Sequence, residues 1–161
     1  MEISFAVITL SDKGYRGQRQ DTSGPLIRQR LEKKGFRHIE SLLLPDEKEP
    51  LRKALTELSE KVDLILTTGG TGLSPRDITP EVTLEVIEKE VPGIAEAMRL
   101  EGLKKTPHAM LSRAVAGIRG NCLIINLPGS PKAVEEGLQV VEAVLEHAIE
   151  KIKGSERECA R

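Results

Sequence analysis

Short apolar runs alternate along the first half of the chain with segments whose apolar residues recur every three or four positions. The runs at 3–10, 38–44 and 62–68 are rich in β-forming residues and predict buried strands. The intervening segments, 22–34 and 47–61, keep a helical period and predict amphipathic helices. Strand and helix in regular alternation are typical of a parallel sheet with right-handed crossovers and helices on both faces.

The second half of the chain predicts two helices, a hairpin and a long amphipathic helix. The segment 79–91 begins with a capping threonine, a proline and an acid, which indicate a helix start, and 94–104 follows it as a second helix. The runs 114–118 and 122–127 flank a tight Arg-Gly-Asn turn and predict an antiparallel pair. Apolar residues recur at helical spacing over 134–152 and predict the last helix.

These elements together predict a single α/β domain, a three-layer α/β/α sandwich with a mostly parallel central sheet. No linker or internal repeat divides the chain. We expect the domain to occupy residues 1–153, followed by a flexible polar tail at 154–161.

The composition argues against several classes of function. A net charge of −1 over 161 residues provides no long-range attraction to nucleic acid or an anionic membrane, and aromatic residues, at 2%, are scarce for base stacking. No stretch approaches the ~20 apolar residues of a membrane span and no basic leader precedes the first strand, so we expect a cytoplasmic protein. Cys122 and Cys159 are too few for a disulfide framework or a cysteine-rich zinc site, and we expect Cys122 in the core.

The segments that follow the predicted strands are the places to search for chemistry, because ligands of open parallel sheets bind beyond the carboxyl ends of the strands. These segments carry small, acidic or glycine residues at 11–14, 45–47, 69–72 and 128–132. Gly69-Gly70-Thr71-Gly72 allows backbone N–H groups to approach a phosphate, although a tight strand-to-helix turn also needs glycine. The chemistry of its continuation, which includes Ser74, Arg76 and Asp77, favours a binding loop.

Acidic residues at these strand ends suggest a metal site. Asp46 and Asp77 would supply two carboxylates to Mg²⁺, which takes one or two carboxylates together with phosphate oxygens and water. Asp12 suits such a site and an ordinary turn equally well. A metal ion bound there would neutralise a polyphosphate and leave its phosphorus open to in-line attack.

Basic residues near the same strand ends would provide a local positive rim if several of them converged on one cleft. They are Lys13, Arg16, Arg19, Arg76, Arg113 and Lys132. The histidines lack the spacing of metal ligands, and we expect His38, His108 and His147 at the surface or in interfaces.

Five motifs, in order, match a known family over nearly the whole chain, from Val7 to about Val144. They are Thr-Thr-Gly-Gly-Thr-Gly at 67–72, Arg-Asp-Ile-Thr-Pro-Glu at 76–81, Pro-Gly-Ile-Ala-Glu-Ala-Met-Arg at 92–99, Leu-Ser-Arg-Ala-Val-Ala-Gly at 111–117 and Asn-Leu-Pro-Gly-Ser-Pro-Lys at 126–132. This combination resembles the molybdopterin adenylyltransferase family, which comprises the bacterial MogA and MoaB proteins and related domains of gephyrin.

The resemblance implies a three-layer α/β domain that assembles as a homotrimer and acts in molybdenum-cofactor biosynthesis. It implies transfer of AMP from Mg²⁺-ATP to molybdopterin, with release of pyrophosphate, and delivery of the product to a molybdenum-insertion protein. Asp46 and Asp77 match the family's essential acids, which implies catalytic and metal-binding roles. The further binding residues implied are Ser11, Asp12, Gly69, Gly70, Thr71, Gly72, Arg76, Thr79, Glu81, Ser112, Arg113, Pro128, Gly129, Ser130, Pro131 and Lys132.

Two readings of the family remain open from the sequence. Some MoaB-type members lack the activity and lose acids at these positions, so the alternative is a non-catalytic, trimeric molybdopterin-binding scaffold. Retention of Asp46 and Asp77 favours the active enzyme, while the Ala-Val-Ala-Gly and Pro-Gly-Ser segments look more like MoaB. A dinucleotide-dependent oxidoreductase is disfavoured, because no Gly-x-Gly-x-x-Gly follows the first strand.

Overall fold

A six-stranded sheet in the order β2-β1-β3-β6-β5-β4 forms the centre of the protein. The computed structural model describes residues 2–156 and residue 158. Strands β2, β1, β3 and β6 run parallel, whereas β5 is antiparallel to both of its neighbours. The strands are β1 (Ser4–Leu10), β2 (Arg37–Leu44), β3 (Leu64–Thr68), β4 (Lys89–Glu90), β5 (Ala116–Arg119) and β6 (Cys122–Leu127).

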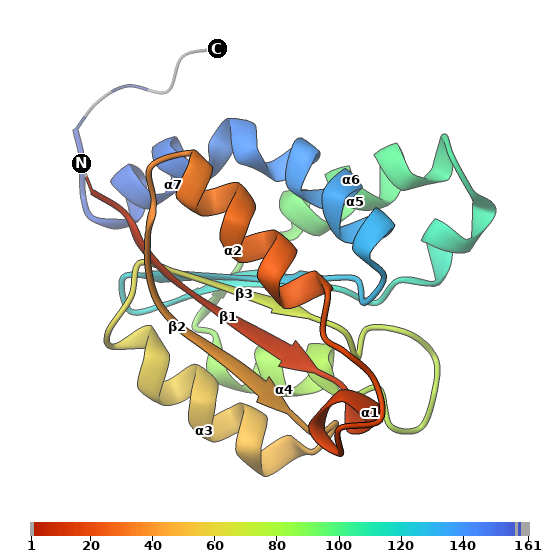
Figure 1. Ribbon diagram of the computed structural model, residues 1–161. Helices are drawn as coiled ribbons and strands as arrows, with labels where there is room; N and C mark the ends of the chain where they lie inside the picture. The colour runs from red at the N-terminus through yellow and green to blue at the C-terminus, as the bar shows by residue number, and fades with distance from the viewer. Residues whose placement is uncertain (1, 157, 159–161) are drawn as a thin grey trace.

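Helices cover both faces of this sheet, which confirms the predicted three-layer α/β architecture (Figure 1). Helices α2, α5, α6 and α7 lie on one face, and α3 and α4 lie on the other. The helices are α1 (Asp12–Tyr15), α2 (Ser23–Lys33), α3 (Lys48–Ser59), α4 (Thr79–Val86), α5 (Pro92–Leu103), α6 (Pro131–Val141) and α7 (Leu145–Ile152), with 3₁₀ turns η1 (Pro107–Leu111) and η2 (Glu142–Val144).

The central strands are apolar on both sides because each side contributes to a separate core. In β1, Phe5 and Val7 pack under α2, α6 and α7, while Ala6 and Ile8 pack against α3. Alternation of side chains along a strand therefore fills two cores from one continuous apolar run. The whole of β1 and β3 is buried, so the loops beyond their carboxyl ends start from fixed positions.

Several elements differ from the sequence-based expectation. Helix α4 ends at Val86, and the following Lys89–Glu90, expected in the same helix, forms the edge strand β4. The helix expected over 134–152 is divided into α6 and α7 by η2. Short local elements also form at α1 and η1, inside segments expected to be irregular.

Asp63, which precedes β3, lies at the edge of the sheet where the parallel strands begin, and it joins two distant parts of the chain there. Its carboxylate accepts hydrogen bonds from the backbone N–H and the hydroxyl of Ser4 and pairs with Lys153 Nζ at 2.7 Å. Ser4 begins β1 and Lys153 follows α7, so both ends of the domain are tied to this edge. The binding loops lie at the opposite edge of the sheet.

The chain after α7 is the segment for which the sequence predicts a flexible tail. Residues 154–156 follow α7 closely, with Ser155 N–H donating to Glu150 O at 3.0 Å, while residues 157 and 159–161, including Cys159, lie outside the described residues. Cys122 is fully buried, and burial raises the pKa of its thiol to about 12, as expected of an inert core residue. In the described part of the chain, no helix is long and apolar enough to cross a membrane.

Candidate functional site

The glycine turn after β3 adopts a conformation that requires glycine. Gly69 and Gly70 have φ values of 95° and 70°, in the left-handed region that side chains disfavour. A Cβ on Gly69 would lie 2.4 Å from the carbonyl oxygen of Leu10, and one on Gly70 would lie 2.3 Å from Thr79 Oγ1. The turn therefore brings bare backbone against the end of β1 and against the start of α4.

A buried polar network supports this turn from below. Asn126, fully buried in β6, donates from Nδ2 to Thr67 Oγ1 and to Thr83 Oγ1, each at 3.0 Å. Thr83 in turn donates to Thr79 O at 2.8 Å, and Thr79 Oγ1 donates to Gly69 O at 2.9 Å. Because every polar atom in this chain of hydrogen bonds has a partner, the network orients the turn at little desolvation cost.

The loop after β6 packs against the glycine turn. A Cβ on Gly129 would lie 3.5 Å from Gly69 Cα. Thr68 Oγ1 donates to Pro128 O at 2.6 Å and Ser23 Oγ donates to Gly129 O at 2.7 Å. The two glycine-containing loops are thus one rigid unit, as their position beyond neighbouring parallel strands predicts.

Asp12 and Asp46 hold together the loops that follow β1 and β2. Asp12 N–H donates to Asp46 Oδ2 at 3.1 Å, and Asp46 N–H donates to Asp12 Oδ1 at 2.9 Å. Arg76 reaches across from the loop after β3 and pairs with both oxygens of Asp12, each at 2.9 Å. Hydrogen bonds from Arg76 and from the Asp46 backbone lower the pKa of Asp12 to about 2.

The environment of Asp46 shifts the pKa of its carboxyl in the opposite direction to that of Asp12. Its Oδ1 is buried and has no hydrogen-bond partner among the described residues, and a Cβ on Gly70 would lie 3.2 Å from it. Burial, followed by the charges of Asp12 and Asp77, raises the pKa of the Asp46 carboxyl. A buried carboxylate oxygen without a partner is under-satisfied, and a cation would relieve both the burial and the repulsion.

Asp77 lies on the neighbouring loop, and its carboxylate is oriented by the backbone. Ser74 N–H donates to Asp77 Oδ2 at 3.0 Å, and a Cβ on Gly72 would lie 2.9 Å from the same oxygen. No cluster of three or more His, Cys, Asp or Glu side chains forms a metal site among the described residues. Two acids fit Mg²⁺ only if phosphate oxygens and water complete its coordination, as is usual for this ion.

Two cavities open at this edge of the sheet. The first, of about 780 Å³, lies beside α1 and α2 and is lined by Ser11, Asp12, Asp46 and Arg76 among others; we call it the α1 cavity. The second, of about 800 Å³, lies between α5, η1 and α6 and includes Thr71, Gly72, Ser112 and Pro128 in its lining; we call it the α5–α6 cavity. The residues common to both linings are Gly70, Asp77, Gly129 and Ser130.

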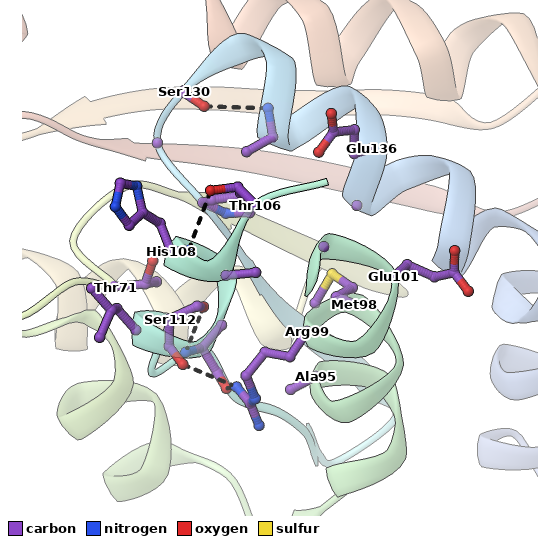
Figure 2. Close-up of a pocket in the computed structure, with 18 of the residues that line it drawn as sticks. Thr71, Ala95, Met98, Arg99, Glu101, Thr106, His108, Ser112, Ser130 and Glu136 are labelled. Atoms are coloured by element: carbon purple, nitrogen blue, oxygen red, sulfur yellow. Dashed lines mark hydrogen bonds between the residues drawn. The ribbon is translucent and has the colours of Figure 1, made fainter. Parts of the chain in front are cut away.

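The shared boundary also holds a helix N-terminus. Ser130 caps the 11-residue helix α6, its Oγ accepting a hydrogen bond from Ala133 N–H at 3.2 Å (Figure 2). Pro131 has no N–H, and the N–H groups of Ala133 and Val134 donate to Ser130, so Lys132 supplies the N–H in this first turn that can bind a ligand. Together with the positive end of the helix dipole, this N–H makes the terminus suitable for an anion.

Most residues predicted to bind ligands line one or both cavities, but some do not. The structure describes all of the predicted binding residues, and four of them line neither of these two cavities: Thr79, Glu81, Arg113 and Lys132. Thr79 is fully buried beneath the glycine turn, and Arg113 is directed at Glu81 and at loop carbonyls. Lys13, Arg16 and Arg19 do line the α1 cavity, which provides the expected positive rim.

Sequence reasoning misses much of the α5–α6 cavity wall. Figure 2 shows Met98 and Arg99 on α5 opposite Glu136 on α6, with Thr106 and His108 of the η1 segment between them and the glycine turn. The sequence signals on the α5 and η1 side of this wall include the 92–99 motif and the Thr-Pro pair at 106–107 that starts η1. His108 is exposed, as expected, but it lines the cavity.

Comparison with known proteins identifies the family. Residues 6–147 match the family described as "Probable molybdopterin binding domain". The molybdopterin adenylyltransferase of Helicobacter pylori (strain ATCC 700392 / 26695) is 40% identical over 157 residues, covering 95% of this chain and 89% of that protein.

A longer protein and a solved structure support the same assignment. The molybdenum cofactor synthesis protein cinnamon of Drosophila melanogaster is 45% identical over 150 residues, which are 91% of this chain but only 25% of that protein. The crystal structure of the molybdopterin biosynthesis enzyme MoaB from Thermus thermophilus superposes with a TM-score of 0.87 at 52% identity, covering 95% of this chain and 98% of the other. Since both its fold and nearly its whole length are matched, the chain belongs to the molybdopterin-binding domain family that its five motifs indicate.

Proposed function

We propose that this protein is a molybdopterin adenylyltransferase of molybdenum-cofactor biosynthesis, which transfers AMP from Mg²⁺-ATP to molybdopterin and releases pyrophosphate. The observation that carries the proposal is the buried Oδ1 of Asp46, which has no hydrogen-bond partner in the part of the chain that the structure describes and lies in a cavity shared with Asp77. The H. pylori relative, which carries this activity in its name, covers nearly the whole chain.

The arrangement of the two cavities suits a reaction between two substrates. AMP transfer requires the terminal phosphate of molybdopterin to attack the α-phosphorus of ATP in line, so both substrates must meet at one point. Gly70, Asp77, Gly129 and Ser130 lie on the boundary of both cavities, and one substrate in each cavity would present its phosphates there. The proposal holds for either assignment of the two substrates to the two cavities.

The residues at this boundary would act by positioning and by charge. Asp46 and Asp77 would hold Mg²⁺, which when bound neutralises charge on the polyphosphate. Backbone N–H groups of the glycine turn and the N–H of Lys132 at the α6 N-terminus would hold phosphate oxygens. Arg76, which is paired with Asp12, lines the same cavity as Asp46 and Asp77 and would contact a polyphosphate bound there.

The test is incubation with molybdopterin, Mg²⁺ and ATP, with measurement of pyrophosphate and of the adenylylated pterin. We expect release of one pyrophosphate for each product, and we expect Asp77→Asn to abolish AMP transfer while the variant stays folded and retains some pterin affinity. Near-normal pyrophosphate release by that variant would overturn the metal assignment. Pterin binding by the unchanged protein without any pyrophosphate release would identify it as the non-catalytic scaffold instead.

We also propose a homotrimer in the cytoplasm that delivers its product to a molybdenum-insertion protein, as the resemblance implies. Exposed leucines and methionine on α5 and η1, Leu100, Leu103, Met110 and Leu111, provide apolar surface that is compatible with subunit contacts. Sedimentation analysis of the purified protein tests the assembly, and a monomer at micromolar concentration would contradict it.

A further inference from the structure

Arg113, which precedes β5, donates hydrogen bonds from all three guanidinium nitrogens to other groups of the protein. Nη1 pairs with both oxygens of Glu81, at 2.9 Å and 2.7 Å. Nε donates to Gly72 O at 2.7 Å, and Nη2 donates to Asp77 O at 2.8 Å. All three nitrogens are therefore occupied by oxygens of the loop after β3 and of α4.

The two loop carbonyls held by Arg113 lie at the two ends of the segment 72–77. Within this segment, Asp77 N–H donates to Ser74 O at 2.9 Å, and Ser74 N–H donates to Asp77 Oδ2. The segment thus closes on itself in a small turn, and most of its residues are exposed. The segment is attached to the body of the protein by the bonds of Arg113 at its two ends and, between them, by the pair of Arg76 with Asp12.

Three observations separate Arg113 from a substrate ligand. It lines neither the α1 cavity nor the α5–α6 cavity, and nor does Glu81. The ion pair of Nη1 with Glu81 compensates the charge of Arg113, which weakens its attraction for a phosphate. The backbone of Arg113 is itself fixed, since its N–H donates to Thr71 O at 2.9 Å.

We propose that Arg113 and Glu81 form a clamp that sets the position of Asp77, and that both are positioning residues rather than ligands of ATP or molybdopterin. This differs from the resemblance-based expectation, which places both among the binding residues. Glu81 lies in the first turn of α4, so it fixes the guanidinium relative to a helix, and the guanidinium then fixes the loop. The role of Asp77 in catalysis rests on the proposed function, but the clamp itself is a property of the loop.

The principal test is Arg113→Lys, which keeps the charge but loses the planar fork needed to hold two carbonyls and a carboxylate together. We expect kcat to fall by about 10- to 100-fold, because small misplacements of catalytic groups have effects of this size, while KM for ATP and for molybdopterin changes by less than about threefold. The Mg²⁺ concentration for half-maximal activity should rise. A ligand role predicts the reverse, a large rise in KM at nearly constant kcat.

A second measurement does not depend on activity. Amide hydrogen exchange of residues 72–78 should be faster in Arg113→Lys and in Glu81→Gln than in the unchanged protein. The matched control is Arg119→Lys, which loses a similar contact from Arg119 Nη1 to Val86 O, at the other end of α4. We expect that control to leave exchange of 72–78 unchanged.

The combined results are decisive in each case. Faster exchange with a kcat effect, and strongly non-additive effects in the Arg113→Lys, Glu81→Gln double variant, support the clamp. Unchanged exchange in a folded Arg113→Lys or Glu81→Gln variant overturns it, whichever kinetic constant moves. If the unchanged protein releases no pyrophosphate, the proposed function fails, but the exchange experiment still decides the clamp.

Discussion

Asp12 and Asp46 are neighbouring carboxylates that exchange hydrogen bonds with each other's backbone, yet their pKa values shift in opposite directions. Asp12 is paired with Arg76 through both oxygens, which lowers its pKa to about 2. Asp46 has one buried oxygen without a partner among the described residues, and burial raises its pKa. Their environments, rather than their residue type or their position beyond a strand, distinguish them.

The difference separates two functions for acids in one site. Asp12 is satisfied within the protein and connects three loops, so its contribution is to shape and stability. Asp46 is unsatisfied within the described structure and gains most when a cation arrives, so its contribution is to binding. Four predictions test this distinction between Asp12 and Asp46.

The largest effect is expected from Asp46→Asn. Loss of the charge that would hold Mg²⁺ should lower kcat/KM by on the order of 1000-fold. Since the substitution removes a buried charge and retains an oxygen for the Asp12 N–H, thermal stability should be unchanged or higher. Activity is followed by pyrophosphate release and stability by thermal unfolding, and a marked drop in melting temperature would place Asp46 with Asp12 as a structural acid.

Gly70→Ala should have the next largest effect, because the added methyl group would lie 2.3 Å from Thr79 Oγ1 and 3.2 Å from Asp46 Oδ1. We expect kcat to fall by roughly 100-fold and stability to fall by about 1–3 kcal/mol through backbone strain and the close contact. Gly35→Ala is the matched control, with φ of 90° and nothing within 4 Å of the added atom. Equal losses of activity in the two variants would show that strain alone, not the space beside Asp46, is responsible.

Asp12→Asn should reduce activity by only about tenfold, because Asp12 acts through the position of the Asp46 loop and through Arg76. Its stability effect has the opposite sign to that of Asp46→Asn. The folded-state pKa of about 2 lies below the ordinary value of 3.8, so Asp12 stabilises the fold above that ordinary value, and this contribution is lost as the pH falls toward 2. Thermal unfolding at neutral pH and near pH 2 should therefore show a difference between the variant and the unchanged protein that shrinks with acid.

The smallest effect concerns the acid limb of the pH–rate profile. Protonation of Asp46 should prevent metal binding, so activity should fall as the pH drops through the raised pKa of that carboxyl. Burial is the main cause of the raised pKa and the charge of Asp12 adds to it, so Asp12→Asn should move the limb to slightly lower pH. Measurement of kcat/KM against pH checks this, and a shift to higher pH would contradict the assignment.

Much of the architecture follows from local pattern. Short runs rich in β-forming residues, such as 3–10, indicate strands buried on both faces when they alternate with segments of helical period. Once the sheet is parallel, the loops after its strands must share one edge, so the proximity of Asp46 and Asp77 follows from topology without any knowledge of side-chain contacts. The glycines of the turn can also be recognised from the local sequence, because the left-handed backbone conformation at Gly69 and Gly70 disfavours other residues.

Several of the unpredicted features depend on partners that are distant in the chain. Lys89–Glu90 is charged and exposed, and it becomes a strand only because β5 offers an edge for pairing. The role of Arg113 depends on the carbonyl groups of Gly72 and Asp77, which lie 41 and 36 residues earlier, and backbone carbonyls leave no mark on a sequence. The α5–α6 cavity likewise results from the angle between two helices, which residue type alone does not determine.

The pairing of Asp63 with Ser4 and Lys153 has a consequence for how larger proteins can be built from this domain. Because both ends of the domain are secured at the edge of the sheet opposite the cavities, additional polypeptide can be joined at either end without crossing the path of a substrate. The domain is in this respect a self-contained module. Cinnamon, of which the matched region is 25%, is a protein in which such a module forms part of a much longer chain.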